Sequence, residues 1–134
     1  MSGKFVPGAE AVRQQLDWGS LGWCSRPADT EAENLVVIEV TLAPGGGHAF
    51  HRHPQQEEMI YVVDGEVEQW CEEEMQVMQP GDAVFLPGGT VHASFNTSDR
   101  DAKLLAILSP AVGDGDGYEV EEVADEPPWN TLRQ

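Results

Sequence analysis

Apolar and polar residues alternate along the middle of the chain with the period of two that is typical of β-strands. The alternation is clearest over residues 35–42, where Val36, Ile38, Val40 and Leu42 share one phase. Further short runs of strand-favouring residues, each flanked by turn signals, occupy residues 48–54, 58–63, 66–71, 75–78, 83–86, 91–95 and 103–108. This pattern predicts an all-β barrel or sandwich.

Two turns suggest how these strands are connected. Asp64-Gly65 is a standard hairpin signal, which predicts that residues 58–63 pair with residues 66–71. Pro87-Gly88-Gly89 predicts a bend that returns residues 91–95 toward the earlier strands.

The two ends of the chain depart from this pattern. Ala9, Val12 and Leu16 are spaced to share one face of a short N-terminal helix over residues 7–16. Residues 111–134 are acidic and glycine-rich, and we expect them to form an arm that lies across the barrel or a partner subunit. We therefore divide the chain into an N-terminal arm (1–34), a barrel core (35–110) and an acidic C-terminal arm (111–134) within one structural domain.

The net charge of −17, from 24 acidic against seven basic residues, is unusual for a chain of 134 residues. Nucleic acid is not an expected partner, because its phosphates would be repelled. The charge fits either an adaptation to high salt or an ordinary acidic surface, and the sequence does not separate the two.

The longest apolar runs, residues 59–63 and 104–108, are five residues each. A transmembrane helix needs ~20 apolar residues, so we expect no membrane association. Two cysteines, Cys24 and Cys71, do not make a disulfide framework. Reduced thiols and the absence of an apolar N-terminal stretch favour a cytoplasmic protein.

Three histidines and a glutamate form the candidate chemical centre. His51 and His53 are two residues apart, so on a strand both rings point to one face. Glu58 follows, and His92 lies after the glycine-rich bend that can return it to the first block. Such nitrogen and oxygen ligands suit one divalent transition metal ion, namely Fe, Mn, Ni, Cu or Zn.

The same two blocks resemble the two signature motifs of the cupin superfamily. The matching positions, at the spacings of the family, are Gly45, His51, His53, Glu58 and Gly65, then Gly81, Pro87, Gly89, His92 and Asn96. The resemblance implies a single cupin barrel (a double-stranded β-helix or jelly roll) and a metal ion held by His51, His53, Glu58 and His92. Glu58 is the expected ligand and not Glu57, because only Glu58 leaves six residues before Gly65.

The neighbouring residues receive simpler interpretations. We expect Glu57 to be a solvated acid, His48 to lie at the surface or rim, and Asn96 to stabilise a turn. The residues that strand phase places toward the pocket are Ile60, Val62 and Ser94, with Trp70, Met75 and Phe85 as further wall candidates.

The expected function is that of a metal-dependent enzyme, of the dioxygenase or isomerase/lyase type, acting on a small metal-chelating molecule. No catalytic residue is identified beyond Glu58, which could serve as a base if it leaves the metal. The alternative is a module that binds or senses a small molecule without turnover. Some small cupins that this chain resembles act on unsaturated uronates, but their catalytic aspartate is replaced here by Ala106.

We also expect a homodimer. Trp18, Trp23 and Trp129 lie in the two arms, and large aromatic side chains are favoured at interfaces. Cupins commonly dimerise, so the resemblance points the same way. The alternative is that both arms fold back on their own barrel.

Overall fold

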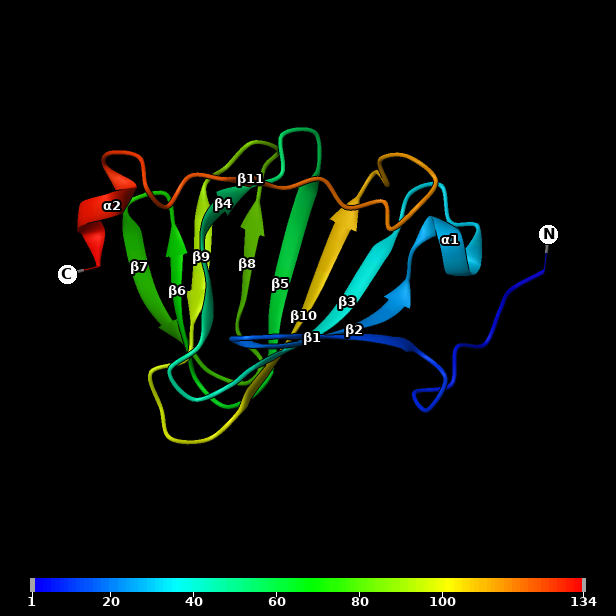
Figure 1. The fold of residues 1–134 in the computed structure, drawn as a ribbon, viewed down its shortest axis with the longest axis horizontal. Coiled ribbons are helices and arrows are strands. Elements are labelled where there is room, and N and C mark those ends of the chain that lie inside the picture. The colour runs from blue at the N-terminus through cyan, green and yellow to red at the C-terminus, as the bar shows by residue number, and fades with distance from the viewer. Residues whose placement is uncertain (1, 134) are drawn as a thin grey trace.

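Two antiparallel sheets pack face to face in the computed structural model, which describes residues 2–133 (Figure 1). The first has the order β1-β2-β3-β10-β5-β8 and the second the order β11-β4-β9-β6-β7. The strands are β1 (Val12–Leu16), β2 (Gly19–Ser25), β3 (Val36–Leu42), β4 (Gly47–Arg52), β5 (Glu57–Asp64), β6 (Val67–Cys71), β7 (Glu74–Met78), β8 (Ala83–Leu86), β9 (His92–Phe95), β10 (Ala102–Ser109) and β11 (Glu121–Glu122). Two four-residue helices, α1 (Pro27–Thr30) and α2 (Trp129–Leu132), complete the fold. The all-β jelly-roll prediction is confirmed.

The main core lies between the sheets and follows from the alternation in the sequence. Every second residue of β3 and β10 is buried, because successive side chains of a strand point to opposite faces. These residues, with Ile60, Val62 and Leu86, form one continuous apolar cluster. A second cluster on the outer face of the five-stranded sheet includes Phe50, Trp70 and Val123.

The N-terminal region is more ordered than the sequence suggested. The expected helix over residues 7–16 is wrong: residues 12–16 form strand β1, which pairs with β2 from Val12↔Trp23 to Leu16↔Gly19. Val12 is 44% exposed, so the apolar spacing did not mark a buried helical face. Pairing with the next strand along the chain overrode the helical periodicity. Among the described residues, no helix is long and apolar enough to cross a membrane.

The predicted hairpin at Asp64-Gly65 is also wrong. Gly65 has a φ of 81°, as a turn glycine should, but β5 and β6 belong to different sheets. Strand β5 already has β10 on one side and β8 on the other. The turn therefore carries the chain from one sheet to the other.

The C-terminal segment, residues 111–133, crosses its own barrel (Figure 1). Strand β11 adds to the edge of the second sheet by pairing with β4, and Val123 is buried in the outer apolar cluster. Trp129 stacks on Phe50 with ring centroids 5.8 Å apart. Trp18 and Trp23 likewise have aromatic partners within the chain, so the homodimer remains a prediction without support from the tryptophans.

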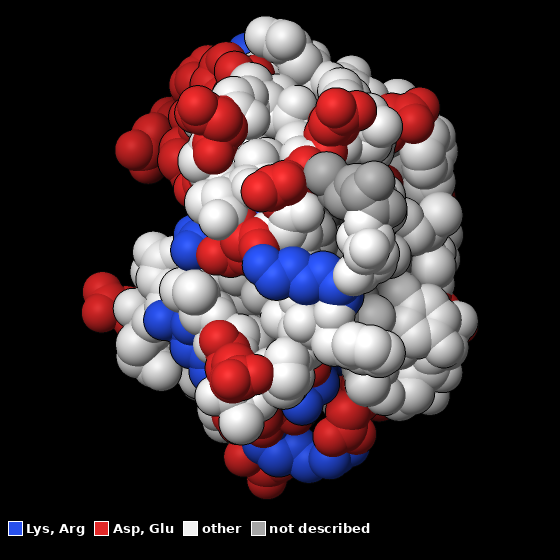
Figure 2. All heavy atoms as spheres, turned by 90° about the vertical axis from the view of Figure 1, so that its right-hand side faces the viewer, with Lys and Arg blue, Asp and Glu red and all other residues white. Residues whose placement is uncertain are grey.

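Acidic side chains are scattered over the face of the molecule shown in Figure 2, with Lys and Arg side chains among them. Arg13 and Lys103, for example, both lie near the carboxylate of Glu39, at 3.7 Å. Exposed pairs of this kind contribute little to stability. With 24 acidic against seven basic residues, most of the negative charge has no basic partner.

Candidate metal centre

The four predicted ligands come from both sheets and meet between them. His51 on β4 pairs in register with His92 on β9, and His53 follows immediately after β4. One ring nitrogen of each histidine lies within 4.8 Å of the others. Glu58, on β5 of the opposite sheet, reaches across: its Oε1 is 3.1 Å from His53 Nε2 and 2.9 Å from His92 Nε2.

Main-chain carbonyls orient all three imidazoles. The Nδ1 atoms of His51, His53 and His92 donate to the carbonyl oxygens of Ala49 (2.6 Å), Glu119 (2.7 Å) and Thr90 (2.9 Å) respectively. Because a carbonyl can only accept, each Nδ1 must carry a proton. In the neutral ring, Nε2 then carries no proton, and its lone pair can bind a metal ion. Metal-binding histidines usually have this arrangement.

Several of the converging atoms lack hydrogen bonds. His53 Nε2, His92 Nε2 and Glu58 Oε1 are buried and have no partner of acceptable geometry among the described residues. A buried polar group without a partner is costly, and three such groups at one point call for an explanation. One divalent ion would satisfy all three, so the residues fit the metal that the motifs imply.

Electrostatics favour an anionic Glu58 carboxylate and a neutral His51 ring, whereas Glu58 favours the protonated form of His92. Burial raises the pKa of Glu58, but the neighbouring His53 and His92 outweigh it and lower this pKa to about 2. Burial, with the adjacent His48 and His92, lowers the pKa of His51 well below its ordinary value. Burial also lowers the pKa of His92, but the contact with Glu58 raises it more.

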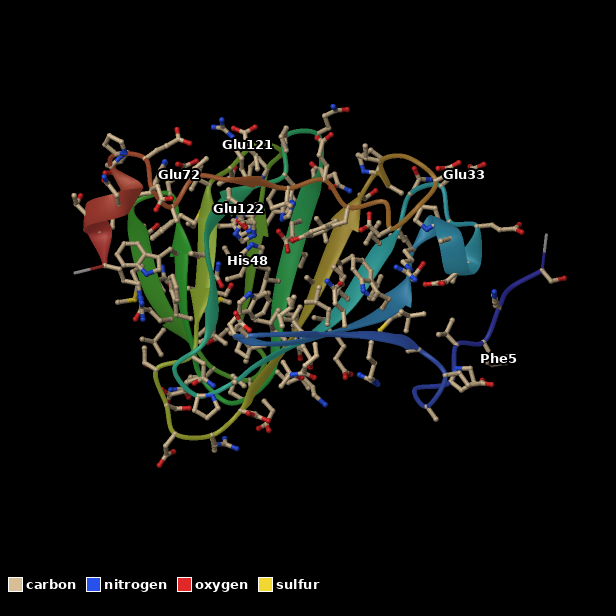
Figure 3. All side chains as sticks on the ribbon, viewed as in Figure 1. Phe5, Glu33, His48, Glu72, Glu121 and Glu122 are labelled. Atoms are coloured by element: carbon tan, nitrogen blue, oxygen red, sulfur yellow. The ribbon has the colours of Figure 1, made fainter. Side chains whose placement is uncertain are left out.

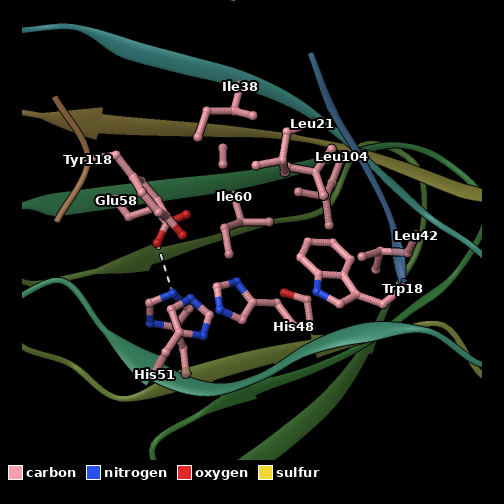
Figure 4. Close-up of a pocket in the computed structure, with 14 residues that line it drawn as sticks. Trp18, Leu21, Ile38, Leu42, His48, His51, Glu58, Ile60, Leu104 and Tyr118 are labelled. Carbon is pink, nitrogen blue, oxygen red and sulfur yellow. Dashed lines mark ion pairs between the residues drawn. The ribbon is translucent and has the colours of Figure 1, made fainter. Parts of the chain in front are cut away.

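A cavity of about 40 Å³ adjoins the imidazoles (Figure 4). Glu58 and the rings of His51 and His92 form one side, and Tyr118 lies beside Glu58. Burial and then the charge of Glu58 raise the pKa of Tyr118 above its usual range, so its phenol stays protonated. The remaining wall is largely aliphatic.

The wall residues expected from strand phase are correct for Ile60 and Ser94 and wrong for Val62, Trp70, Met75 and Phe85. Ile60 and Ser94 line the cavity. Met75 and Phe85 are 44% and 50% exposed, and thus face away from it. Val62 belongs to the main core, Trp70 belongs to the outer cluster, and Ala106 lines the cavity.

The neighbours of the ligands largely match their interpretations. Glu57 is exposed. The Asn96 side chain donates to the carbonyls of Leu42 and Arg100 and accepts from Ser98, which fixes a turn. His48 is half-buried and hydrogen bonds to Glu122 at 2.7 Å (Figure 3). Its ring stacks on that of His51, with ring centroids 3.5 Å apart.

Sequence reasoning missed two contributors from the C-terminal segment and the residue that holds it. Tyr118 lines the cavity, and the main-chain carbonyl of Glu119 orients His53. Gln56, only 1% exposed, donates to the carbonyls of Pro110 and Gly117 and accepts from the amide of Glu119. In the sequence, the one available signal was a glutamine between the candidate ligands His53 and Glu58.

Comparison with known proteins identifies the family. The model of the cupin domain matches residues 38–108, which is more than half of the chain. The chain belongs to the cupin family. This cupin is 37% identical over 87 residues to an uncharacterized protein of Aquifex aeolicus, a match that covers 65% of the chain and 66% of that protein.

Two further comparisons describe the breadth of the family. The cupin is 28% identical over 99 residues to quercetin 2,3-dioxygenase of Bacillus subtilis, covering 69% of the chain but 29% of the dioxygenase. The solved structure of KdgF from Halomonas sp. superimposes with a TM-score of 0.74 at 24% identity, covering 84% of the chain and 98% of KdgF. The second similarity supports the fold alone.

Proposed function

We propose that this cupin is a metal-dependent enzyme that acts on a small metal-chelating molecule, with the ion held by His51, His53, Glu58 and His92. One observation carries the proposal. Buried Nε2 and carboxylate oxygen atoms converge without hydrogen-bond partners, while each Nδ1 is committed to a main-chain carbonyl. The donor set would leave positions for a substrate, as a catalytic site requires.

Chemistry at such a site would rest on the ion more than on protein acids and bases. A bound ion would supply Lewis acidity toward a carbonyl or enolate oxygen. Among the residues that line the cavity, Glu58 is the only carboxylate, and as a ligand it is not free to act as a base. Tyr118, as a neutral phenol, can donate a hydrogen bond to a substrate oxygen.

The second candidate is a module that binds or senses a small molecule without turnover. The lack of a free carboxylate or lysine along the cavity favours it over enzymes that need a general base. The similarity to a dioxygenase favours the enzyme, since dioxygen chemistry does not require such a base. Turnover of chelating substrates by the metal-loaded protein distinguishes the two candidates.

Metal content tests the ligand assignment. Replacing any one of His51, His53, Glu58 or His92 by alanine should strongly reduce the bound metal in purified protein while the barrel still folds. His48→Ala and Glu57→Ala are matched controls, because both residues are neighbours of ligands and should leave the metal content unchanged. Near-stoichiometric metal in a His51→Ala, His53→Ala double variant would sink the assignment.

A further inference from the structure

The inner cavity lies beside a larger outer groove. Trp18, Leu21, His48 and Tyr118 line both the cavity of about 40 Å³ and a neighbouring groove of about 390 Å³. These four residues therefore form a neck between the two spaces. The inner cavity alone has room for a few atoms, so a ligand larger than that must extend through the neck into the groove.

Apart from Glu58, the wall of the inner cavity that the first sheet forms has no polar side chain (Figure 4). It is formed by aliphatic side chains of β3, β5 and β10, namely Ile38, Val40, Leu42, Ile60, Leu104 and Ala106. The polar side chains that line the cavity are those of the histidines, Glu58 and Tyr118, of Ser94, whose hydroxyl donates to Gln69, and of Trp18 at the neck. A ligand is thus recognised mainly through polar atoms at the end that holds Glu58 and the histidines.

No lysine or arginine is among the residues that line the two spaces. The ionised groups are carboxylates: Glu58 inside, and Asp116 and Glu122 along the groove. A divalent ion with Glu58 and three neutral imidazoles would carry a net charge of +1. A ligand with one negative charge neutralises that site, whereas a dianion leaves a buried negative charge with no cation beside it, which is costly.

The groove offers flat apolar surfaces that lead to the metal ligands. Trp18 stacks on His48 at 5.5 Å between centroids, and His48 stacks on His51 at 3.5 Å. The rings thus form a continuous stack from the groove to the candidate metal centre. Leu16, Trp23 and Val120 extend the apolar surface of the groove. A planar or aliphatic body would bury apolar area against these side chains.

We propose that this site takes a molecule with two adjacent oxygen donors that together carry at most one negative charge, attached to an apolar body that lies in the neck and groove. The inference rests on the proposed metal function and narrows its substrate class. Dicarboxylates are disfavoured because they bring two charges, and sugar acids are disfavoured in the inner cavity because its aliphatic wall would leave their hydroxyl groups unsatisfied.

Two chelating probes test the charge preference by binding alone. Metal stoichiometry is measured first, and tropolone and oxalate are then titrated into the metal-loaded protein by calorimetry. Tropolone is a planar monoanionic chelator, whereas oxalate is a dianionic one. Each affinity is divided by the same probe's affinity for the free ion, which removes intrinsic chelating strength. We expect this normalised affinity to be at least tenfold higher for tropolone than for oxalate.

Variants at the neck and rim test the structural cause. Leu21→Lys places a cation at the neck and should raise the oxalate affinity at least tenfold, while Leu21→Met should leave the preference unchanged. If the lysine is not tolerated at this half-buried position, Gln14→Lys at the exposed edge of the groove should raise oxalate affinity about threefold.

The possible outcomes distinguish the proposed metal function from the proposed substrate class. Absence of stoichiometric metal would overturn the proposed function and the substrate class with it. Stoichiometric metal with equal or tighter normalised oxalate binding would overturn the substrate class alone. Failure of both lysine variants to favour oxalate would show that the missing cation is not the cause of the preference.

Discussion

Gln56 is the residue whose replacement should most clearly reveal how the C-terminal segment is held. Its side chain is 1% exposed and makes hydrogen bonds of 2.8, 2.8 and 3.0 Å with the main chain of Pro110, Gly117 and Glu119. A Gln56→Leu variant keeps the size of the side chain but removes all three bonds. The main-chain groups of the segment then lose their partners.

The expected cost can be worked from these contacts. A neutral hydrogen bond contributes about 1 kcal/mol net, so three lost bonds cost about 3 kcal/mol. A buried group left unpaired can cost ~1–3 kcal/mol, which raises the total, but local detachment would let water reach these groups and limit the cost. We therefore expect the free energy of unfolding to fall by about 3–5 kcal/mol, and the melting temperature by about 10 °C or more.

The assay is denaturant unfolding combined with hydrogen exchange of the amide of Glu119, which should lose protection because the segment opens locally. Gln55→Leu is the matched control, because Gln55 is the exposed neighbour of the same residue type. Its effect should stay within about 0.5 kcal/mol. Equal stability of the two variants would refute the view that Gln56 anchors the segment.

Three further predictions concern charge and assembly. If the net charge of −17 is a high-salt adaptation, the melting temperature should rise from dilute buffer to molar NaCl at constant metal occupancy, and a flat profile would favour an ordinary acidic surface. Burial raises the pKa of Glu68, but hydrogen bonds from Arg133 and Trp70 lower it below the ordinary value. Its contribution to stability should therefore be complete above about pH 5 and decline at lower pH, and a Glu68→Gln variant that follows the wild-type acid profile would contradict this. The expected homodimer should form through the exposed apolar outer face that includes Tyr61 and Phe85, so Tyr61→Lys should give a monomer in light scattering, whereas an unchanged dimer would exclude this face.

The part of the fold that followed from the sequence is the part in which each strand is buried on one side. The alternation over residues 35–42 predicted strand β3 to within one residue at its N-terminal end. The strand predicted over residues 103–108 lies within β10. In such strands, burial imposes the period of two on the residue types themselves. Strand β1 has no such imprint, because its side chains are mostly exposed.

Turn signals carried less information than the strands. Asp64-Gly65 does turn, yet the chemistry of a turn fixes only its own backbone and not the sheet that the next strand enters. That choice depends on which edges are already occupied, and β5 has neighbours on both sides. Sheet membership is a non-local property that two residues cannot encode.

The limit of prediction is sharpest at the site itself. The motifs identified His51, His53, Glu58 and His92 as candidate ligands, because a metal site would demand particular side chains at particular spacings, and these four side chains do converge. The group that orients His53 is the main-chain carbonyl of Glu119, 66 residues away. Every residue of a chain has such a carbonyl. A main-chain partner does not require a particular residue type at position 119, so the sequence does not reveal it. The only indication in the sequence is Gln56, whose side chain accepts a hydrogen bond from the amide of Glu119. A buried glutamine between two candidate ligands is therefore the feature from which a second layer of main-chain contacts can be sought in chains of this kind.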